Sequence, residues 1–260
     1  MPVADQQRRD RPAALVTGGA KRIGRAIVEA LAGDGCPLAI HCNSSREEAN
    51  AIAAAIVDRG GTAAVIGGDL SQLRELERIV EAAEAAVGPI GLLVNNASRF
   101  ENDAAESLNA ANLTSHFSIN LAAPCLLAAA IAKRLPPEST GLVINIVDQR
   151  VLKPTPLFFS YSLSKAGLWW ATQTMAQALA PRIRVVALGP GPTLKSSRQD
   201  DDDFRRQCEA IPLGRGPDLA EFGRTIRWLV ETPSVTGQFI ALDGGQHLSW
   251  QTPDIIGIQE

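Results

Sequence analysis

Seven short apolar runs recur along the chain, separated by longer stretches that are rich in alanine. Each run is almost continuously apolar, without the alternation of a half-exposed strand. This is typical of strands that are covered on both faces of a parallel sheet. We therefore predict strands at Ala13–Thr17, Leu38–Cys42, Ala63–Ile66, Leu92–Asn95, Leu142–Val147, Ile183–Leu188 and Gln238–Leu242.

The stretches between the first strands have the spacing of amphipathic helices. One helix is predicted over Arg25–Ala32. A second follows Ser45 and Glu48, which have the spacing of a capping box, and its apolar stripe is Ala49, Ile52, Ala53, Ile56 and Val57. A third opens at Ser71 and ends at Gly88-Pro89, with a stripe of Leu73, Leu76, Ile79, Val80 and Ala83.

The alternation of strands and helices predicts an α/β fold with one doubly wound parallel sheet of about seven strands. No internal repeat and no long linker divides the 260 residues, so residues 1–260 are treated as a single domain. Residues 1–12 are expected to be flexible. Ligands of such sheets bind beyond the carboxyl ends of the strands, so we expect one crevice between the loops after Thr17, Cys42, Asn95, Val147 and Leu188.

Composition excludes several classes of protein. A hydrophobic content of 45%, a mean hydropathy of +0.02 and a net charge of −3 exclude intrinsic disorder. Because 25 basic residues face 28 acidic ones, there is no basic excess for general nucleic-acid binding. The longest apolar run, Leu121–Ala132, is shorter than the roughly 18 residues of a spanning helix, so no membrane partner is expected.

Cysteines, histidines and the N-terminus bear on the compartment. The four cysteines share no CxxC spacing and the three histidines are scattered, so no metal site is predicted. No apolar segment follows the charged N-terminus, so no secretory signal is predicted. We therefore expect a cytoplasmic protein with reduced, buried cysteines.

The loop after the first strand, Thr17–Gly24, has the marks of a phosphate-binding turn. Gly18, Gly19 and Gly24 let the backbone turn sharply and approach a pyrophosphate, whose charge is favoured at the start of the next helix. Because the full GxGxxG pattern is absent, an ordinary strand-to-helix turn is the alternative.

The end of the second strand favours NADP over NAD. An NAD site places Asp or Glu here to bond the ribose hydroxyls. This strand runs Ile40-His41-Cys42-Asn43-Ser44-Ser45 without an acid, and Arg22 is a nearby cation. Arg22, Ser44 and Ser45 suit a 2′-phosphate. Alternatively, Arg22 is a solvated charge and Ser45 only a helix cap.

Four motifs, in this order and spacing, resemble the short-chain dehydrogenase/reductase family: Thr17-Gly18 to Gly24, Asn95-Asn96-Ala97, Tyr161-Ser162-Leu163-Ser164-Lys165 and Pro190-Gly191. The resemblance covers the chain from about residue 13 to 247. It implies a Rossmann-like fold, a nicotinamide cofactor and a homotetramer.

Three departures from the family pattern resemble its pteridine reductases and bacterial dihydromonapterin/dihydrofolate reductases. Arg22 replaces a loop glycine. Ser98, followed by Arg99-Phe100, stands where most members have glycine, and Asp148 replaces the catalytic serine thirteen residues before Tyr161. The turn with His41 fits this subgroup, whereas Ser44 replaces an arginine of some members.

The resemblance assigns site residues. It implies catalytic roles for Asp148, Tyr161, Lys165 and Asn120 and substrate contacts for Ser98, Phe100, Asp148 and Tyr161. It implies NADPH or NADP+ contacts for Gly18, Lys21, Arg22, Ile23, His41, Ser44, Ser45, Asp69, Leu70, Asn96, Ala97, Ser98, Lys165, Pro190 and Gly191.

Tyr161 and Lys165 are four residues apart, so on a helix they share one face. A phenol has a reference pKa of about 10, and a nearby ammonium favours the phenolate, so we expect Lys165 to lower the pKa of Tyr161. The resemblance adds that Lys165 bonds the nicotinamide ribose. The alternative is a surface lysine beside a buried tyrosine.

Asp148 ends an apolar strand at the crevice, where a carboxyl group needs a partner. It could hydrogen-bond ring N–H and amino groups of a pterin, or supply a proton. We infer that it works with Tyr161 in a relay that protonates a ring nitrogen while NADPH delivers hydride to the adjacent carbon. A carboxylate that faces water is the alternative.

Three further side chains have two interpretations each. Phe100 could stack a flat heterocycle against the nicotinamide, or be a core or lid residue. Asn120 matches the family's asparagine that orders a water in the proton relay, or is a buried polar group in a helix bend. His41 could donate to the adenosine phosphate, or pack structurally.

By the resemblance, residues 192–217 cap the substrate. Within them Asp200–Asp203 is expected to be a solvated, mobile stretch without a ligand contact. Family members pair through the helix that carries Lys165, so exposed faces near Trp169 and Trp170 are expected to be buried between subunits.

The predicted function is NADPH-dependent reduction of a pterin or folate small-molecule substrate. The alternatives are a carbonyl reductase of the same family with an altered triad and a non-catalytic nucleotide-binding regulator. Intact Tyr161, Lys165 and Asn120 disfavour the regulator. Ser98, Phe100 and Asp148, together with Arg22, favour the pterin reductase, because ketone reduction needs none of the first three.

Overall fold

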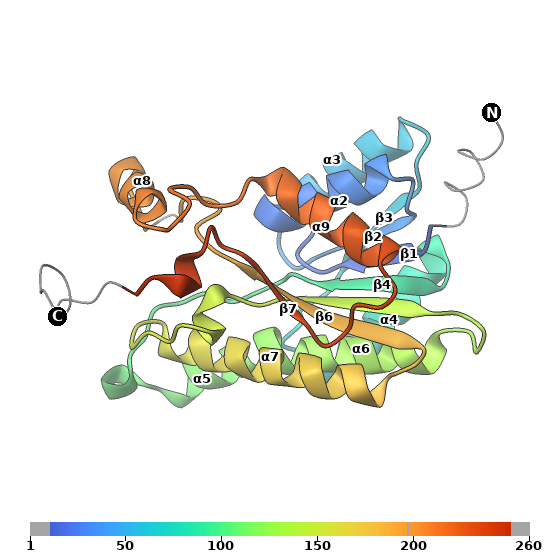
Figure 1. Ribbon diagram of the computed structural model, residues 1–260. Coiled ribbons are helices and arrows are strands. Elements are labelled where there is room, and N and C mark those ends of the chain that lie inside the picture. The colour runs from blue at the N-terminus through green and yellow to red at the C-terminus, as the bar shows by residue number, and fades with distance from the viewer. Residues whose placement is uncertain (1–10, 197, 251–260) are drawn as a thin grey trace, which may run out of the picture.

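All seven predicted strands are present (Figure 1). The first and last residue of each strand lie within two residues of the prediction. The computed structural model describes residues 11–196 and 198–250, so the prediction for residues 1–12 lies outside the described residues up to residue 10. The strands are β1 (Ala13–Val16), β2 (Leu38–Cys42), β3 (Ala63–Gly67), β4 (Ile90–Asn95), β5 (Gly141–Ile146), β6 (Ile183–Pro190) and β7 (Phe239–Leu242).

The strands form one parallel sheet in the order β3-β2-β1-β4-β5-β6-β7. The chain builds outwards from β1 to β3, then returns to the other side of β1 and continues to β7. The order therefore reverses between β1 and β4, which is where ligands of open α/β sheets bind. The predicted Rossmann-like, doubly wound fold is confirmed.

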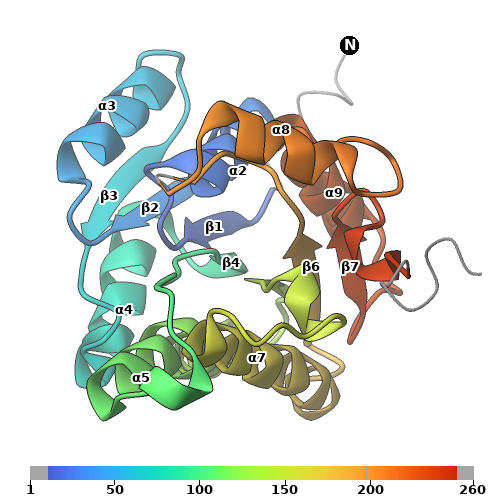
Figure 2. The same cartoon turned by 90° about the vertical axis from the view of Figure 1, so that its left-hand side faces the viewer.

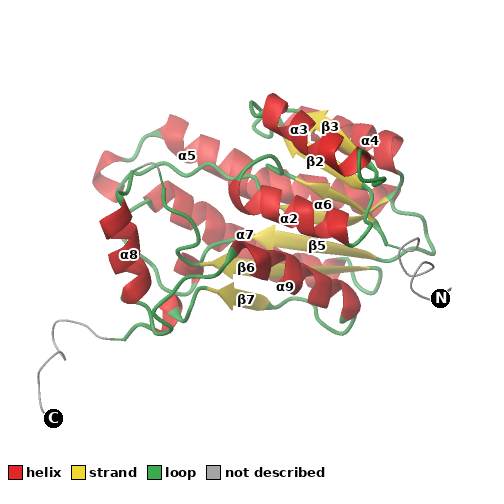
Figure 3. Ribbon diagram, turned by 90° about the horizontal axis from the view of Figure 1, so that it is seen from above, coloured by secondary structure: helices red, strands yellow, loops and turns green. Residues whose placement is uncertain are grey.

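Helices cover both faces of the sheet (Figure 2). One face carries α2 (Arg22–Gly33), α3 (Arg46–Val57) and α9 (Leu219–Glu231), and the other carries α4 (Leu76–Val87), α6 (Ala123–Arg134) and α7 (Phe159–Ala178). A π-helical segment, Ser118–Ala122, joins α5 (Ala110–Phe117) to α6. The arrowheads of β5 and β7 point to the end of the molecule where α8 (Asp201–Glu209) lies (Figure 3).

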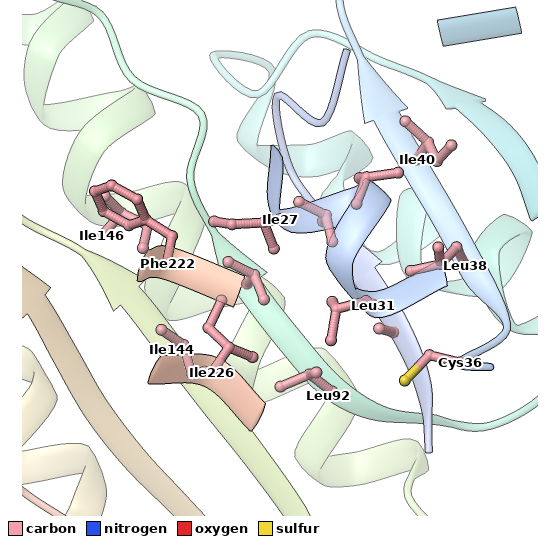
Figure 4. Close-up of a cluster of buried hydrophobic side chains, with 14 of the residues drawn as sticks. Ile27, Leu31, Cys36, Leu38, Ile40, Leu92, Ile144, Ile146, Phe222 and Ile226 are labelled. Atoms are coloured by element: carbon pink, nitrogen blue, oxygen red, sulfur yellow. The ribbon is translucent and has the colours of Figure 1, made fainter. Parts of the chain in front are cut away.

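The buried side chains between the sheet and the layer of α2, α3 and α9 form one continuous core (Figure 4). Ile27 of α2 and Phe222 of α9 are fully buried in it, and burial of one such side chain contributes about 1.5–3 kcal/mol. Gly223 lets α9 lie directly against α2, because a Cβ at this position would clash with the Ala30 Cβ. The two helices thereby fix the turn that precedes α2.

Two helix starts and one helix cap differ from the predictions. The helix expected at Arg25 begins three residues earlier, at Arg22. The Ser45 side chain makes no capping hydrogen bond, so the predicted capping box is wrong. The helix expected at Ser71 begins with a 3-10 turn over Leu73–Glu75, and Leu73 is partly exposed instead of lying on the buried stripe.

One helical stretch, Ala110–Arg134, is long and apolar enough to cross a membrane by length and composition alone. Leu127, Ala128 and Ile131 on its inner side are buried in the core below the sheet, where the stretch packs against α4. It therefore occupies the place of a core helix in this fold.

Candidate active site

A cavity of about 1030 Å³ lies beyond the carboxyl ends of the strands, around the reversal between β1 and β4. Its volume is at the top of the usual range for small-molecule sites, about 300–1,000 Å³. Every residue predicted to contact the cofactor lines it, as do Phe100, Asp148 and Tyr161. Asn120 does not line it.

The glycine turn after β1 has room for a phosphate group because its side chains are missing. Gly18 has a φ of +61°, and a Cβ on Gly24 would clash with the Gly18 carbonyl oxygen. Asn96 closes the turn, since its Nδ2 donates to the carbonyl oxygens of Thr17 (2.9 Å) and Gly18 (3.1 Å). With the N-terminus of α2 facing this space, the residues fit the pyrophosphate of a dinucleotide.

Arg22 stands in the left-handed region, with a φ of +52°, where the family pattern has glycine. Its guanidinium donates to the carbonyl oxygens of Leu194 and Lys195, at 3.0 Å each, in the segment that follows β6. Its predicted contact with a 2′-phosphate stays a prediction. Next to it, Lys21 pairs with Glu48 at 2.7 Å, which takes the carboxylate that the capping box would have used.

His41 makes contacts with the protein backbone, as expected for a residue that packs structurally. Its Nδ1 accepts from the Gly18 amide at 3.4 Å and its Nε2 donates to the Gly68 carbonyl at 3.1 Å, so both ring nitrogens are engaged. Burial lowers its pKa to about 4, although the Gly68 hydrogen bond and Asp69 act the other way. A neutral, fully bonded ring is not placed to donate to a phosphate.

Asp148 and Tyr161 meet in the cavity. The Tyr161 hydroxyl donates to Asp148 Oδ2 at 2.8 Å, and Asp148 Oδ1 accepts from the Arg150 amide at 2.9 Å. Asp148 follows β5, whereas Tyr161 is in the first turn of α7. The phenol is almost fully buried, and the carboxylate is the acceptor for its proton.

The predicted effect of Lys165 on Tyr161 is wrong. Burial, and then the charge and hydrogen bond of Asp148, raise the pKa of Tyr161 well above its usual value, against a lowering by Arg150. Lys165 donates instead to the Ile146 carbonyl at 2.7 Å, with its Nζ 5.8 Å from the Tyr161 ring centre. Burial lowers the pKa of Lys165 to about 8, while Asp148 raises it. Tyr161 is therefore held in its neutral form, with its hydroxyl donating to Asp148.

Asn120 has the contacts of a buried polar group in a helix bend. Its Oδ1 accepts from the Arg99 amide (2.8 Å) and the Ser98 hydroxyl (3.1 Å), and its Nδ2 donates to the Arg99 carbonyl (2.9 Å) and Ser164 Oγ (3.0 Å). All four hydrogen-bonding positions of its amide are thus occupied by protein, and it lies in the π-helical segment. It ties the loop after β4 to α7.

The loop that Asn120 holds places Phe100 against two other rings. Phe100 stacks on Phe158 with centroids 4.4 Å apart and an interplanar angle of 5°, and meets Tyr161 edge-on at 4.7 Å. Phe158 was not predicted. It stands three residues before Tyr161, at a φ of +55°, so its closeness to the catalytic motif was the available signal.

The capping segment, 192–217, lines the cavity with Gln199, Phe204 and Gln207 among others. Arg198 ties it to the loop after β4, because its guanidinium donates to Glu101 at 2.6 Å and to the Phe100 carbonyl at 3.3 Å. The expectation for Asp200–Asp203 is wrong in part. The run is exposed, but Asp200 caps α8 by accepting from the Asp203 amide, and the acids form the first turn of α8.

The comparisons with known proteins agree with this geometry. The family model of the short chain dehydrogenases matches residues 12–205. The chain belongs to the short chain dehydrogenase family.

In residues 11–196 and 198–250, no three His, Cys, Asp or Glu side chains form a group that could hold a metal ion.

Two solved structures are similar over nearly the whole chain. Both are FolM Alternative dihydrofolate reductase 1 with NADP. The protein from Brucella canis is 55% identical, with a TM-score of 0.93 and coverage of 96% of this chain and 99% of that one. The one from Brucella suis is 56% identical, with a TM-score of 0.92 and coverage of 95% and 98%. The 3-oxoacyl-[acyl-carrier-protein] reductase of Synechocystis is 29% identical over 89% of this chain and 95% of its own length.

Proposed function

We propose that this oxidoreductase reduces the ring of a dihydropterin or dihydrofolate-type substrate with NADPH. The observation that carries the proposal is the hydrogen bond from Tyr161 to Asp148 in the cavity beyond the carboxyl ends of the strands. Ketone reduction in the family needs no carboxylate at this position. A pterin, in contrast, presents ring N–H and amino groups from which a carboxylate can accept hydrogen bonds. The two FolM structures, at 55% and 56% identity, support the same substrate class.

NADPH is the cofactor in this proposal. When bound it supplies the hydride. The glycine turn and the start of α2 would hold its pyrophosphate, and Ser44 and Ser45, which line the cavity after β2, would lie near its adenosine ribose without a carboxylate to repel a 2′-phosphate. The NADP in both FolM structures supports this choice.

The chain's own residues supply the proton. Reduction of a C=N bond needs one hydride on carbon and one proton on nitrogen, and Tyr161 holds a proton on its hydroxyl beside the Asp148 carboxylate. A ring nitrogen placed at this pair can take the proton, and the carboxylate keeps the phenol oriented meanwhile. Lys165, buried with its Nζ 5.8 Å from the centre of the phenol ring, would in this proposal bond the nicotinamide ribose.

The ring of the substrate would lie against the aromatic wall of Phe100 and Phe158. A flat bicyclic ring stacks on such a wall better than an acyl chain does. Ser98, which lines the cavity beside Phe100, would then be within reach of the polar edge of the ring.

The test is NADPH oxidation with dihydrobiopterin, dihydrofolate, dihydromonapterin and a panel of diketones. We expect turnover of at least one of the pterin or folate substrates and little or none of the diketones. In Asp148→Ser, which restores the family serine, pterin turnover is expected to fall by about 10²–10⁴-fold. Diketone turnover by the wild type, or pterin turnover retained by Asp148→Ser, would instead favour the carbonyl reductase.

We also propose a homotetramer in the cytoplasm. Trp170 on α7 is 70% exposed, and Leu163 of α7 and Leu126 of α6 are also exposed. Exposed apolar side chains on these two helices support pairing through this layer. All four cysteines are free, as a reducing compartment requires. Mass determination in solution for the wild type and Trp170→Glu tests the assembly.

A further inference from the structure

Arg150 lies in a cage that none of the predicted roles uses. Its guanidinium carbon is 5.1 Å from the ring centre of Phe158, 5.6 Å from that of Phe100 and 6.0 Å from that of Tyr161. A guanidinium is attracted to aromatic rings because the faces of the rings carry negative charge density. Three rings together therefore restrict a long side chain that would otherwise sample many rotamers.

The open side of this cage faces Asp148. Arg150 Nη1 lies 3.3 Å from Asp148 Oδ2, the same oxygen that accepts from the Tyr161 hydroxyl. The other oxygen, Oδ1, accepts from the Arg150 amide, because Asp148 caps the short 3-10 helix η4 (Gln149–Val151). One residue thus holds both oxygens of the carboxylate, one through its backbone and one through its side chain.

We propose that Arg150 is a positioning residue of this site, whose caged guanidinium fixes the Asp148 carboxylate on the Tyr161 hydroxyl. Oδ2 accepts from the Tyr161 hydroxyl, and its direction is set by the cap on Oδ1 and by the guanidinium beside Oδ2. The Tyr161 hydroxyl and the guanidinium both contact this one oxygen, so the hydroxyl proton is directed at the carboxylate. This inference rests on the proposed reaction for its kinetic consequence, although the clamp itself does not.

The other charges around Asp148 are accounted for. From α7, Tyr161 is neutral and Lys165 donates to a backbone carbonyl. From the loop after β4 and the capping segment, Glu101 and Arg198 pair with each other. Arg150 is therefore the cation in direct contact with the carboxylate within the described part of the chain. The short helix η5 (Gln246–Leu248), which packs on η4, brings a His247 that is paired with the carboxylate of Asp243.

Two other roles make different predictions. If Arg150 only packs against the rings, its loss changes stability and leaves the pH profile in place. If it binds the substrate directly, as a cation would bind the carboxylates of a folate tail, its loss raises KM for dihydrofolate but not for a tailless dihydropterin.

The test compares the wild type with R150Q, R150K and R198Q. Arg198 is a matched control, because its guanidinium also lies over Phe100, at 5.8 Å, but it bonds Glu101 and not Asp148. For R150Q we expect kcat at neutral pH to fall by about tenfold or more, as for a misplaced catalytic group. The acidic limb of the kcat profile should move up by about one pH unit, since a carboxylate without its cation takes up a proton more readily.

In this test R150K should recover most of kcat and the position of the limb, and R198Q should leave the limb in place. KM for the pterin and the dissociation constant of NADPH, read from its fluorescence, should stay within about twofold in R150Q. An unmoved limb, or a change in KM alone, overturns the proposal.

A second measurement needs no substrate. Urea unfolding of R150Q, D148N and the double variant forms a cycle, in which D148N keeps an amide oxygen for the cap but removes the charge. The two effects should be non-additive if the guanidinium clamps the carboxylate, and additive effects would overturn the clamp. If no pterin is turned over by the wild type, the proposed function fails, while this cycle still decides the role of Arg150.

Discussion

The protonation of Tyr161 can be measured directly, because it is the single tyrosine of the chain. Its near-ultraviolet tyrosinate band therefore reports one residue. The phenol is 6% exposed and donates to a carboxylate at 2.8 Å, a charge-assisted bond worth about 1.5–3 kcal/mol that ionisation would abolish. Both effects keep the phenol neutral, so its pKa is raised and not lowered.

The expected result is a small signal at alkaline pH. An ordinary phenol with a pKa of about 10 is about one-tenth ionised at pH 9, and the folded wild type should show that much tyrosinate or less. In Asp148→Asn the repelling charge is removed, so tyrosinate should appear at lower pH than in the wild type. Circular dichroism at each pH controls for unfolding, and the protein in urea supplies the unshifted reference. A half-developed tyrosinate band at pH 8 in the wild type would refute the reasoning and restore Lys165 as the controlling charge.

The remaining predictions concern catalysis, cofactor choice and stability. Tyr161→Phe should lower kcat by about 10²–10⁴-fold and leave the dissociation constant of NADPH nearly unchanged, since the hydroxyl bonds Asp148; retained turnover would show that another acid operates. Arg22→Gly should weaken NADPH more than NADH, as measured by fluorescence titration of both, and an equal loss would exclude a 2′-phosphate contact. Burial lowers the pKa of His41 to about 4 in the folded state, against about 6.5 in the unfolded state. The neutral ring therefore makes its full contribution to the free energy of unfolding above pH 6.5, and this contribution is lost as the pH falls towards 4. This loss is on the order of 3 kcal/mol, and urea unfolding of His41→Gln should not show it; an identical pH slope in both proteins would contradict the assignment.

The fold was predictable because the strands and helices of a doubly wound sheet have distinct local sequence patterns. Buried parallel strands need continuous apolar runs. The loops that follow the strands lie at one edge of the sheet, so the order of the elements was enough to predict that the loops after β1 and β4 border one crevice. Helix starts were less predictable. Ser45 and Glu48 have the right spacing for a cap, but Lys21, from another element, binds the Glu48 carboxylate in the structure. Competition between partners that are distant in sequence is not visible in spacing.

The candidate site shows the same division. Asp148 and Tyr161 come from separate elements, yet the motif order placed them correctly at one crevice. The sign of the Tyr161 pKa shift was missed because it depends on which charge is closer, and a helical spacing of four residues does not say that Lys165 turns to a backbone carbonyl. Arg150 was missed because its role comes from three rings and a carboxylate that meet only in the folded chain.

Arg22 connects the phosphate-binding turn after β1 to the segment after β6, and it does so from a left-handed backbone conformation. A side chain at a φ of +52° costs about 1 kcal/mol or more relative to glycine, which the family pattern has here. Two hydrogen bonds to Leu194 and Lys195 offset that cost, and they tie the phosphate turn to the start of the capping segment. A phosphate that draws the guanidinium away from these carbonyls would release that end of the cap. If the predicted contact of Arg22 with the 2′-phosphate forms, this one side chain would link cofactor binding to the position of the capping segment, and a glycine could not do so.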